Sequence, residues 1–224
     1  MMRSLWTAAT GMQGQQFLMD TIANNLSNVN TVGFKKNRVD FQDLLYQSLR
    51  MAGSPSSLHR QNQAKYPTGT EAGLGVEVAG TQKLYTQGSA KQSDNELDVM
   101  IFGNGFFRIQ MPDGRLGYSR EGAFKIDPNG DILTSDGYYL EPRITIPQDY
   151  IPGSIGISEE GFVTVKTAAS PNDPIQVGQI LTYRFVNPAG LTNVGKNLAV
   201  ASEASGASIE GVPGRQGFGF LKQR

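Results

Sequence analysis

The stretch DTIANNLSNVNTVGFKK, residues 20–36, ends a helix and reverses the chain. Asparagines favour helix ends and turns because their side chains bond to nearby backbone groups. Gly33 follows them and is expected to adopt the left-handed conformation that ends many helices. The stretch therefore predicts one long N-terminal helix followed by a sharp turn. Its asparagines are Asn24, Asn25, Asn28 and Asn30.

Before this turn, residues 4–29 contain no proline and carry an apolar repeat. Leucine or methionine recurs every seven residues, and a second apolar row follows three positions later. This a/d pattern is typical of a helix that packs along another helix. A second possibility is that the stripe lies on the protein's own β domain. The predicted assembly interface consists of Leu5, Met12, Met19, Ile22, Leu26 and Val29.

The rest of the predicted helix is poor in charge. From Met1 to Phe34, Arg3 and Asp20 are the only charged residues, and most other polar positions are amides or hydroxyls. These groups can be buried when hydrogen-bonded without the cost of burying charge. The composition therefore predicts a helix whose outer face also meets protein.

The following connector, residues 35–88, changes character along its length. Residues 39–51 fit either a second short amphipathic helix, built on Val39, Leu44, Leu45 and Leu49, or a strand-like extension. Residues 52–75 show neither a helical nor a strand period, and such long loops are unusual in compact domains. We expect them to be disordered alone or extended against another surface. Residues 76–88 are expected to be extended, and His59, the single histidine, to be exposed and inert.

Residues 89–190 predict an all-β domain. Short apolar runs alternate with turns that contain Asp-Gly or Asn-Gly, which are strong hairpin signals. The segment 175–185 indicates a longer strand. The expected fold is therefore mainly β, with an elongated all-β domain, an amphipathic N-terminal helix and an extended connector. The expected core and cross-strand aromatics are Phe106, Phe107, Phe124, Tyr138 and Tyr139.

Composition and motifs argue against several classes of protein. The 20 basic and 20 acidic residues cancel, so no global attraction to nucleic acid or anionic membrane is expected. No apolar run approaches the ~20 residues of a membrane span. The acidic residues at 94, 96 and 98 lack histidine or cysteine neighbours, and no nucleophile is paired with a base. We predict no catalytic residue, no cofactor and no metal site, and hence no enzyme.

The opening stretch resembles the signature shared by bacterial flagellar rod and hook proteins. The runs GNGFF, DPNGDILTSDGYYL and VGKNLAVASEASGA resemble later parts of the same family, so the similarity covers nearly the whole chain. The connector at 46–88 is most similar to that of distal rod members. The residues that fit the signature are Ala23, Asn24, Asn25, Leu26, Asn28, Thr31, Gly33, Phe34 and Lys35.

This resemblance implies a structural subunit of the distal rod. It would be exported unfolded by the flagellar type III apparatus and would assemble helically with copies of itself. The resulting rigid drive shaft would cross the periplasm to the outer membrane and transmit torque to the hook. The implied partners are the proximal rod, the hook, the P- and L-ring proteins and the export apparatus, without nucleic acid or membrane insertion.

Family members continue into a C-terminal helix, whereas this sequence ends at GFLKQR, residues 219–224. The axial helix is expected at 1–34, and residues 191–224 are expected to lead back toward a helix outside the sequence. We therefore expect residues 1–30 to be poorly anchored and filament formation by this chain to be impaired. The alternatives are a proximal rod or hook subunit, a secreted adhesin or carbohydrate-binding module, and a peptidoglycan hydrolase.

Overall fold

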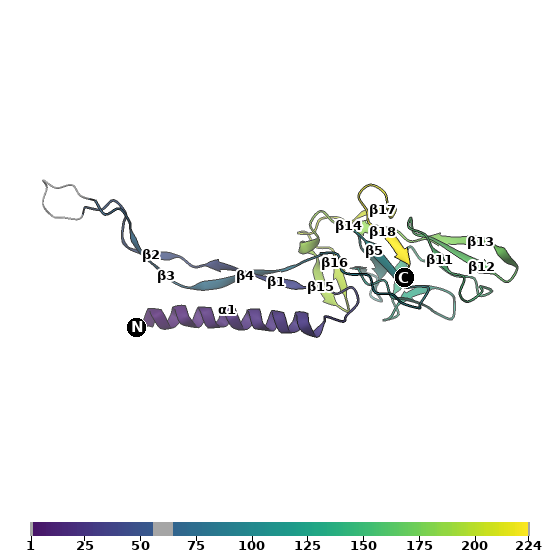
Figure 1. Cartoon of the computed structure of the whole chain (residues 1–224), viewed down its shortest axis with the longest axis horizontal. Coiled ribbons are helices and arrows are strands. Elements are labelled where there is room, and N and C mark those ends of the chain that lie inside the picture. Colours follow the sequence, from purple (N-terminus) through teal and green to yellow (C-terminus); the bar gives the residue numbers. More distant parts are fainter. Residues whose placement is uncertain (1, 56–64, 224) are drawn as a thin grey trace. The chain divides into compact units, whose positions relative to one another are not determined.

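The computed structural model describes residues 2–55 and 65–223 and is mainly β, with α1 at the N-terminus (Figure 1). The prediction of a mainly β chain with an N-terminal helix is confirmed. His59 lies outside the described residues. The elements are α1 (Met2–Ser27), β1 (Asn37–Asp43), β2 (Tyr46–Arg50), β3 (Thr70–Gly73), β4 (Val76–Lys83), β5 (Val99–Phe102), β6 (Phe107–Gln110), β7 (Leu116–Ser119), β8 (Phe124–Ile126), β9 (Ile132–Thr134), β10 (Tyr139–Glu141), β11 (Gly156–Ile157), β12 (Phe162–Thr167), β13 (Ser170–Gln179), β14 (Thr182–Arg184), the 3-10 turn η1 (Pro188–Gly190), β15 (Thr192–Gly195), β16 (Leu198–Val200), β17 (Ile209–Gly211) and β18 (Phe220–Gln223).

The chain divides into two compact units. The first, called the helix–ribbon unit, holds the residues up to Val29 together with Lys36–Leu84. The second, called the β unit, holds Asn30–Lys35 and the chain from Tyr85 onward. The signature loop at residues 30–35 therefore belongs to the β unit, whereas the helix before it and the strand after it belong to the helix–ribbon unit.

In the helix–ribbon unit, the connector forms a two-stranded antiparallel ribbon. Strand β1 pairs with β4, and β2 pairs with β3. The strand alternative for residues 39–51 is therefore correct and the helix alternative is wrong. Within the stretch 52–75, which shows no strand period, residues 70–73 form β3. Each strand of this ribbon takes its hydrogen bonds from a partner twenty or more residues away along the chain, so no local pattern marks it.

In the β unit, a seven-stranded antiparallel sheet has the order β15-β16-β7-β6-β10-β9-β8. A three-stranded sheet, β11-β12-β13, and the pairs β14-β17 and β18-β5 complete the unit. Four of these strands, β15 to β18, lie within residues 191–224, and β16 and β18 pair with β7 and β5. This last part of the sequence thus belongs to the same unit as the strands before it, because it pairs with them.

The Gly-containing turns form the tight hairpins that the sequence predicted. The turn at residues 127–130 joins β8 to β9, and the turn at 135–137 joins β9 to β10. Gly130 has a φ of 92°, and a Cβ there would lie 2.1 Å from the carbonyl oxygen of Ile146. Only glycine fits this position, because it has both a left-handed backbone and no space for a side chain.

The predicted long strand at 175–185 is wrong in its bounds. Strand β13 runs from Ser170 to Gln179, and after Ile180 and Leu181 the chain enters β14, which pairs with β17 in another sheet. Strand β13 is the outer strand of its sheet and contains Pro171 and Pro174. Residues 171–174 have no register partner on β12.

The core of the β unit is apolar and well filled. Phe107 is fully buried and meets Phe124 edge to face, with ring centroids 5.1 Å apart. Phe106 meets Phe185 in the same way in a second cluster, whereas Tyr138 and Tyr139 are only partly buried. The main cluster consists of Leu97, Val99, Ile101, Phe107, Phe124, Ile132, Leu140, Ile144, Ile146, Ile155, Ile157, Val163, Val165, Ile180 and Leu221.

Candidate assembly surface

Helix α1 lies on the ribbon with the side that carries Gly14. A Cβ on Gly14 would sit 3.2 Å from the ring of Phe41 in β1 and 3.8 Å from Val76 in β4, so the helix approaches the strands closely there. Thr10 lies against Gly75 on the same side. The sequence analysis gave Gly14 no role, and a glycine between two glutamines offers no signal without its distant neighbours.

The heptad row of the predicted interface lies away from the Gly14 side of α1. At 3.6 residues per turn, the seam of Leu5, Met12, Met19 and Leu26 lies roughly 120–180° around the helix from Gly14. The side chains are 51–70% exposed, a large fraction for apolar residues. Met2 and Trp6, which the sequence analysis did not include, are 73% and 70% exposed on the same helix. The six residues whose exposure this range covers are Leu5, Met12, Met19, Ile22, Leu26 and Val29.

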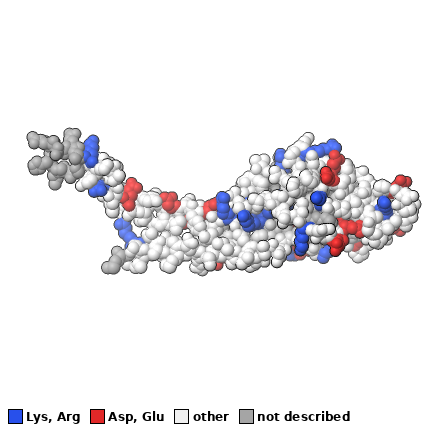
Figure 2. Space-filling model, in the orientation of Figure 1, with Lys and Arg blue, Asp and Glu red and all other residues white. Residues whose placement is uncertain are grey.

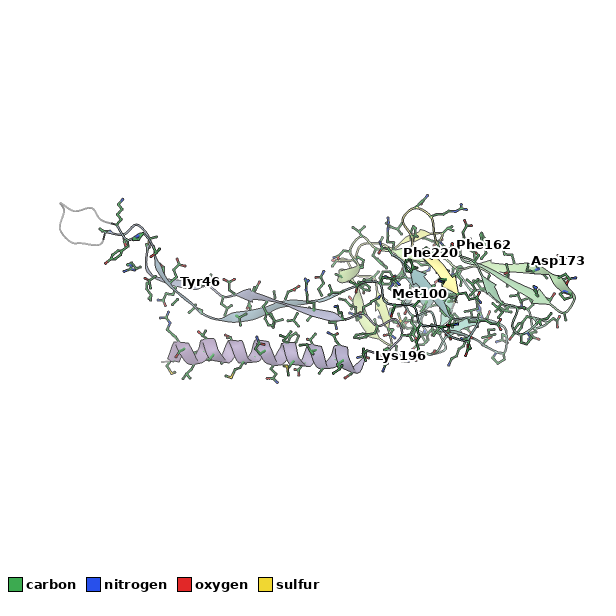
Figure 3. The ribbon with its side chains drawn as sticks, viewed as in Figure 1. Tyr46, Met100, Phe162, Asp173, Lys196 and Phe220 are labelled. Carbon is green, nitrogen blue, oxygen red and sulfur yellow. The ribbon has the colours of Figure 1, made fainter. Side chains whose placement is uncertain are left out.

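The ribbon is exposed as well. Every residue of β2 is exposed, and Leu45 just before it is 82% exposed. Figure 3 shows the side chains of the ribbon near Tyr46 standing out on both sides of the backbone. Isolated two-stranded ribbons are only marginally stable in water. These strands therefore offer apolar surface and unpaired backbone edges for contact with another chain.

The signature residues at the helix end bond to backbone groups. The Asn25 side chain donates to the carbonyl of Asn37 and accepts from its amide, both at 2.9 Å, and so acts as a short strand beside the start of β1. The Asn28 amide donates to both the carbonyl and the side-chain oxygen of Asn24 at 3.0 Å. These bonds end the helix and hold the start of β1 next to it.

The later signature residues lie in the β unit. Gly33 has the expected left-handed φ of 75°, and a Cβ there would be 2.8 Å from the backbone nitrogen of Glu121. Lys35 donates from Nζ to the carbonyl of Thr86 at 2.7 Å. Burial, and then the nearby Arg120 charge, lower the pKa of Lys35. The signature therefore joins two different sets of contacts, one at the helix end and one on the β unit.

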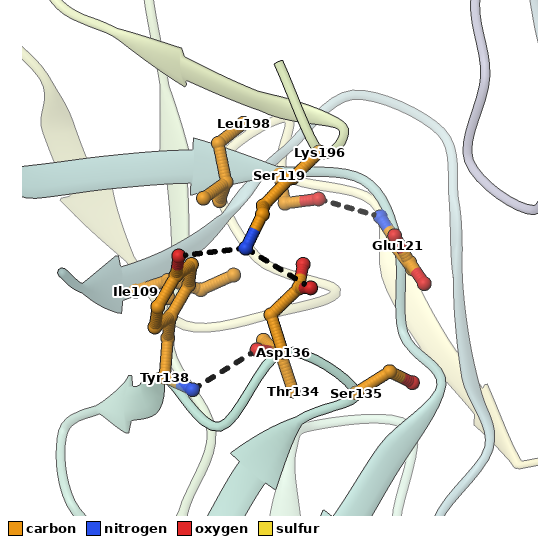
Figure 4. Close-up of a pocket in the computed structure, with 9 residues that line it drawn as sticks. All are labelled: Ile109, Ser119, Glu121, Thr134, Ser135, Asp136, Tyr138, Lys196 and Leu198. Atoms are coloured by element: carbon orange, nitrogen blue, oxygen red, sulfur yellow. Dashed lines mark hydrogen bonds and ion pairs between the residues drawn. The ribbon is translucent and has the colours of Figure 1, made fainter. Parts of the chain in front are cut away.

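A small polar hollow lies between the turn after β9 and the hairpin of β15 and β16 (Figure 4). Lys196 Nζ donates to the Tyr138 hydroxyl at 3.1 Å and pairs with Asp136 at 3.3 Å. The hydroxyls of Ser119 and Thr134 accept bonds from the backbone amides of Glu121 and Tyr138. Because the lysine is paired and these hydroxyls are hydrogen-bonded to backbone, the hollow offers structure rather than an activated nucleophile.

The acidic residues considered as a metal site have structural partners. Asp98 accepts from Ser93 Oγ at 2.6 Å and Asn95 Nδ2 at 2.8 Å, and Glu96 accepts from the Ile155 amide at 2.9 Å. Within residues 2–55 and 65–223, no group of three or more metal-ligating side chains comes together. No helix in this part of the chain is long and apolar enough to cross a membrane.

The comparison with known proteins first defines the class. Residues 5–35 match the family of flagella basal body rod proteins, and residues 100–165 match the D1 domain of the flagellar hook proteins FlgE/F/G. These two matches cover the helix with its signature and the central part of the β unit. They define a flagellar rod or hook protein.

The particular family follows from full-length relatives. The chain belongs to the family of the flagellar basal-body rod protein FlgG. It is 50% identical to FlgG of Borreliella burgdorferi over 100% of this chain and 82% of that protein, and 43% identical to FlgG of Buchnera aphidicola subsp. Schizaphis graminum over 100% and 83%. A hook protein, FlgE of Helicobacter mustelae, is 38% identical over 80% of this chain but only 37% of its own length, so the hook alternative is not favoured.

Proposed function

We propose that copies of this protein assemble helically into the distal part of the flagellar rod, as a rigid shaft that transmits torque to the hook. The observation that carries this proposal is the apolar stripe of α1, which is exposed in a chain of the FlgG family. The role is structural and its place is the flagellar basal body. Chemistry is not required, because the work of such a subunit is done by its contacts.

The stripe supplies the free energy for assembly. Burying one Leu, Ile or Met side chain contributes about 1.5–3 kcal/mol, so six such residues contribute on the order of 10 kcal/mol when covered. Leu26 near one end of α1 is exposed to nearly the same extent as Leu5 near the other end, so a covering partner would be another long helix. A further copy of this chain, or another axial subunit with the same helix, fits that description.

The distribution of charged residues favours a protein of the same kind as a partner over a polyanion such as nucleic acid. On the face shown in Figure 2, basic and acidic residues are interspersed over the β unit and sparse over α1. Such a surface attracts neither nucleic acid nor an anionic membrane strongly. The proposed partners are therefore other copies of the chain, the proximal rod, the hook, the P- and L-ring proteins and, before assembly, the type III export apparatus.

The ribbon is proposed to stiffen the shaft. Laid along neighbouring copies, it would bury Leu45, Tyr46 and Leu49 and link each subunit to more than one other. Deletion of residues 52–75 removes β3 and with it the partner of β2. We expect rods with this deletion to bend more easily or to join the hook poorly in electron micrographs. Rods of unchanged bending stiffness would contradict this role.

The stripe is tested by substitution in the natural full-length protein. Met12→Gln with Met19→Gln is expected to abolish rod formation and motility, because two apolar side chains that the proposed assembly would bury are replaced by amides. The matched control is Met12→Leu with Met19→Leu, which keeps both positions apolar and of similar size and should assemble normally. Circular dichroism checks that the helix content is unchanged. Normal rods from the double variant would refute the proposal.

A further inference from the structure

The hairpin of β15 and β16 closes with an unusual turn. Its two loop residues, Lys196 and Asn197, both have left-handed φ values, 52° and 56°. Two-residue hairpins of this kind strongly prefer Asn-Gly or Asp-Gly, because other residues are disfavoured with φ above zero. Lys196 is nevertheless held there by its bonds to Tyr138 and Asp136, which Figure 4 shows. The turn is thus fixed in position by side chains of the β unit.

This turn presents Asn197 to the signature loop. Asn197 Nδ2 donates to the carbonyl of Val32 at 3.1 Å and to Glu121 Oε2 at 2.9 Å. One amide group therefore joins the loop to the strand end that also packs against Gly33. Both contacts need a donor, which aspartate lacks.

The other end of the loop is also tied down. Lys35 bonds to the carbonyl of Thr86, and Asn197 and Lys35 thus hold the loop at two points three residues apart. If released, the six residues 30–35 could extend to about 20 Å, at ~3.4 Å per residue. Such slack would lie between the helix and the β unit of every subunit.

We propose that the Lys196–Asn197 turn is a clasp that holds residues 30–35 on the β unit and so removes slack from the chain at this point. The inference rests on the proposed function, because a shaft made of many subunits is stiff only if no subunit contains a loose segment. It assigns Asn197 a positioning role in torque transmission.

The clasp is tested first by limited trypsin digestion of the full-length protein, followed by mass spectrometry. Two variants remove the donor: Asn197→Asp, which keeps the size and the tolerance for a left-handed backbone but places a second carboxylate beside Glu121, and Asn197→Gly, which fits the turn best and adds no charge. In both, cleavage after Lys35 is expected to be at least tenfold faster. Cleavage after Arg215, whose side chain is 64% exposed in another turn, serves as the internal reference. Val194→Thr, an exposed position in the same hairpin, should change neither rate.

Unchanged cleavage at Lys35 in both Asn197 variants would overturn the clasp. An equal acceleration at Lys35, at Arg108 in β6 and at Arg184 in β14 would show general destabilisation and would also overturn it. The second measurement is the bending of rods assembled from Asn197→Gly, which should exceed that of Val194→Thr rods. Faster cleavage at Lys35 with unchanged rod bending would overturn the mechanical role of the clasp. It would leave the proposed function intact, because that function is tested separately by the Met12 and Met19 variants.

Discussion

The β unit and the helix–ribbon unit differ in how much of their apolar surface they bury. The β unit buries a main cluster of fifteen core residues and closes it with strands from distant parts of the sequence. Among the described residues of the helix–ribbon unit, Gly14 and Val39 are the only buried ones. The β unit is stabilised by its own interior, whereas the helix–ribbon unit leaves most of its large apolar residues exposed. Large apolar residues thus form a buried core in the β unit and exposed surface in the helix–ribbon unit.

The difference is also visible in how polar groups are used. In the β unit, the buried Asp131 accepts bonds from Arg143 and from Thr145 Oγ1, the latter at 2.6 Å. In the helix, hydroxyls such as Thr7 and Thr21 only bond back to their own helix carbonyls. On the ribbon, Arg38 bonds to Gln82 at 3.0 Å and Arg50 bonds to Thr70 at 3.1 Å, both at exposed positions. The polar contacts of the ribbon thus lie at its surface, whereas that of Asp131 is buried in the β unit.

The largest effect that would sharpen this comparison is expected from Phe107→Ala. Phe107 is fully buried and packs edge to face on Phe124, so the variant leaves a cavity in the core. We expect the free energy of unfolding of the β unit to fall by about 3–5 kcal/mol. Urea denaturation followed by far-UV circular dichroism measures this loss of stability. A loss below ~1 kcal/mol would show that the core is not what holds this unit together.

A smaller effect is expected from Gly14→Leu at the contact of helix and ribbon. The new side chain would meet Phe41 and Val76, and overpacking of this kind costs typically about 1–3 kcal/mol. Amide exchange in β1 should become faster. Gly11→Ala is the matched control, because nothing lies within 4 Å of its added Cβ, and it should stabilise the helix by roughly 0.5–1 kcal/mol. Equal behaviour of the two variants would mean that α1 does not rest on the ribbon.

The pH dependence of the β unit offers a third comparison. Hydrogen bonds from Arg143 and then Thr145 lower the pKa of Asp131. Because this pKa is lower in the folded than in the unfolded chain, the carboxylate stabilises the fold above the unfolded value of ~3.9. That stabilisation is lost as the pH falls through the folded pKa. The Tm of Asp131→Asn should therefore be lower than wild type at pH 7 and fall less between pH 5 and pH 2.5. Tm-against-pH curves that run parallel for wild type and Asp131→Asn would show that Asp131 does not cause the pH dependence. The exposed control Glu203→Gln should follow wild type.

The smallest effect on the isolated subunit is expected from Leu5→Ala. Its side chain is 67% exposed, so its removal should change the stability by no more than about 0.5 kcal/mol. The same substitution should weaken assembly measurably in sedimentation or light scattering of the natural protein. A large loss of stability in the subunit alone would mean that the stripe is already covered, and the contrast between the units would be lost.

Much of this architecture could be predicted where the signal is local. Asp-Gly and Asn-Gly turns mark the hairpins of the β unit, because the residues that set a tight turn are neighbours in sequence. Gly33 could be recognised in the same way from its place after the asparagines. The core aromatics Phe107 and Phe124 follow from the alternation of the strands.

The ribbon and the clasp could not be predicted, for physical reasons. Leu45 and Leu49 are four residues apart, which fits a helix, and β2 has no buried face to impose a two-residue period. Its pairing with β3 depends on residues more than twenty positions later. Asn197 contacts Val32 across 165 residues, and an asparagine before a strand is ordinary in any sequence. Contacts of this range leave no pattern that a single sequence reveals.

The outer strand β13 has a consequence for a molecule that must associate with itself. Its exposed stretch at 171–174 contains two prolines, lacks partners on β12, and includes Asp173, labelled in Figure 3. Proline has no amide hydrogen to donate, and a bulged, charged edge is a poor template for another strand. The free edge of β13 is thereby a poor site for cross-β growth, so that copies of the chain that come together at high concentration are discouraged from pairing there.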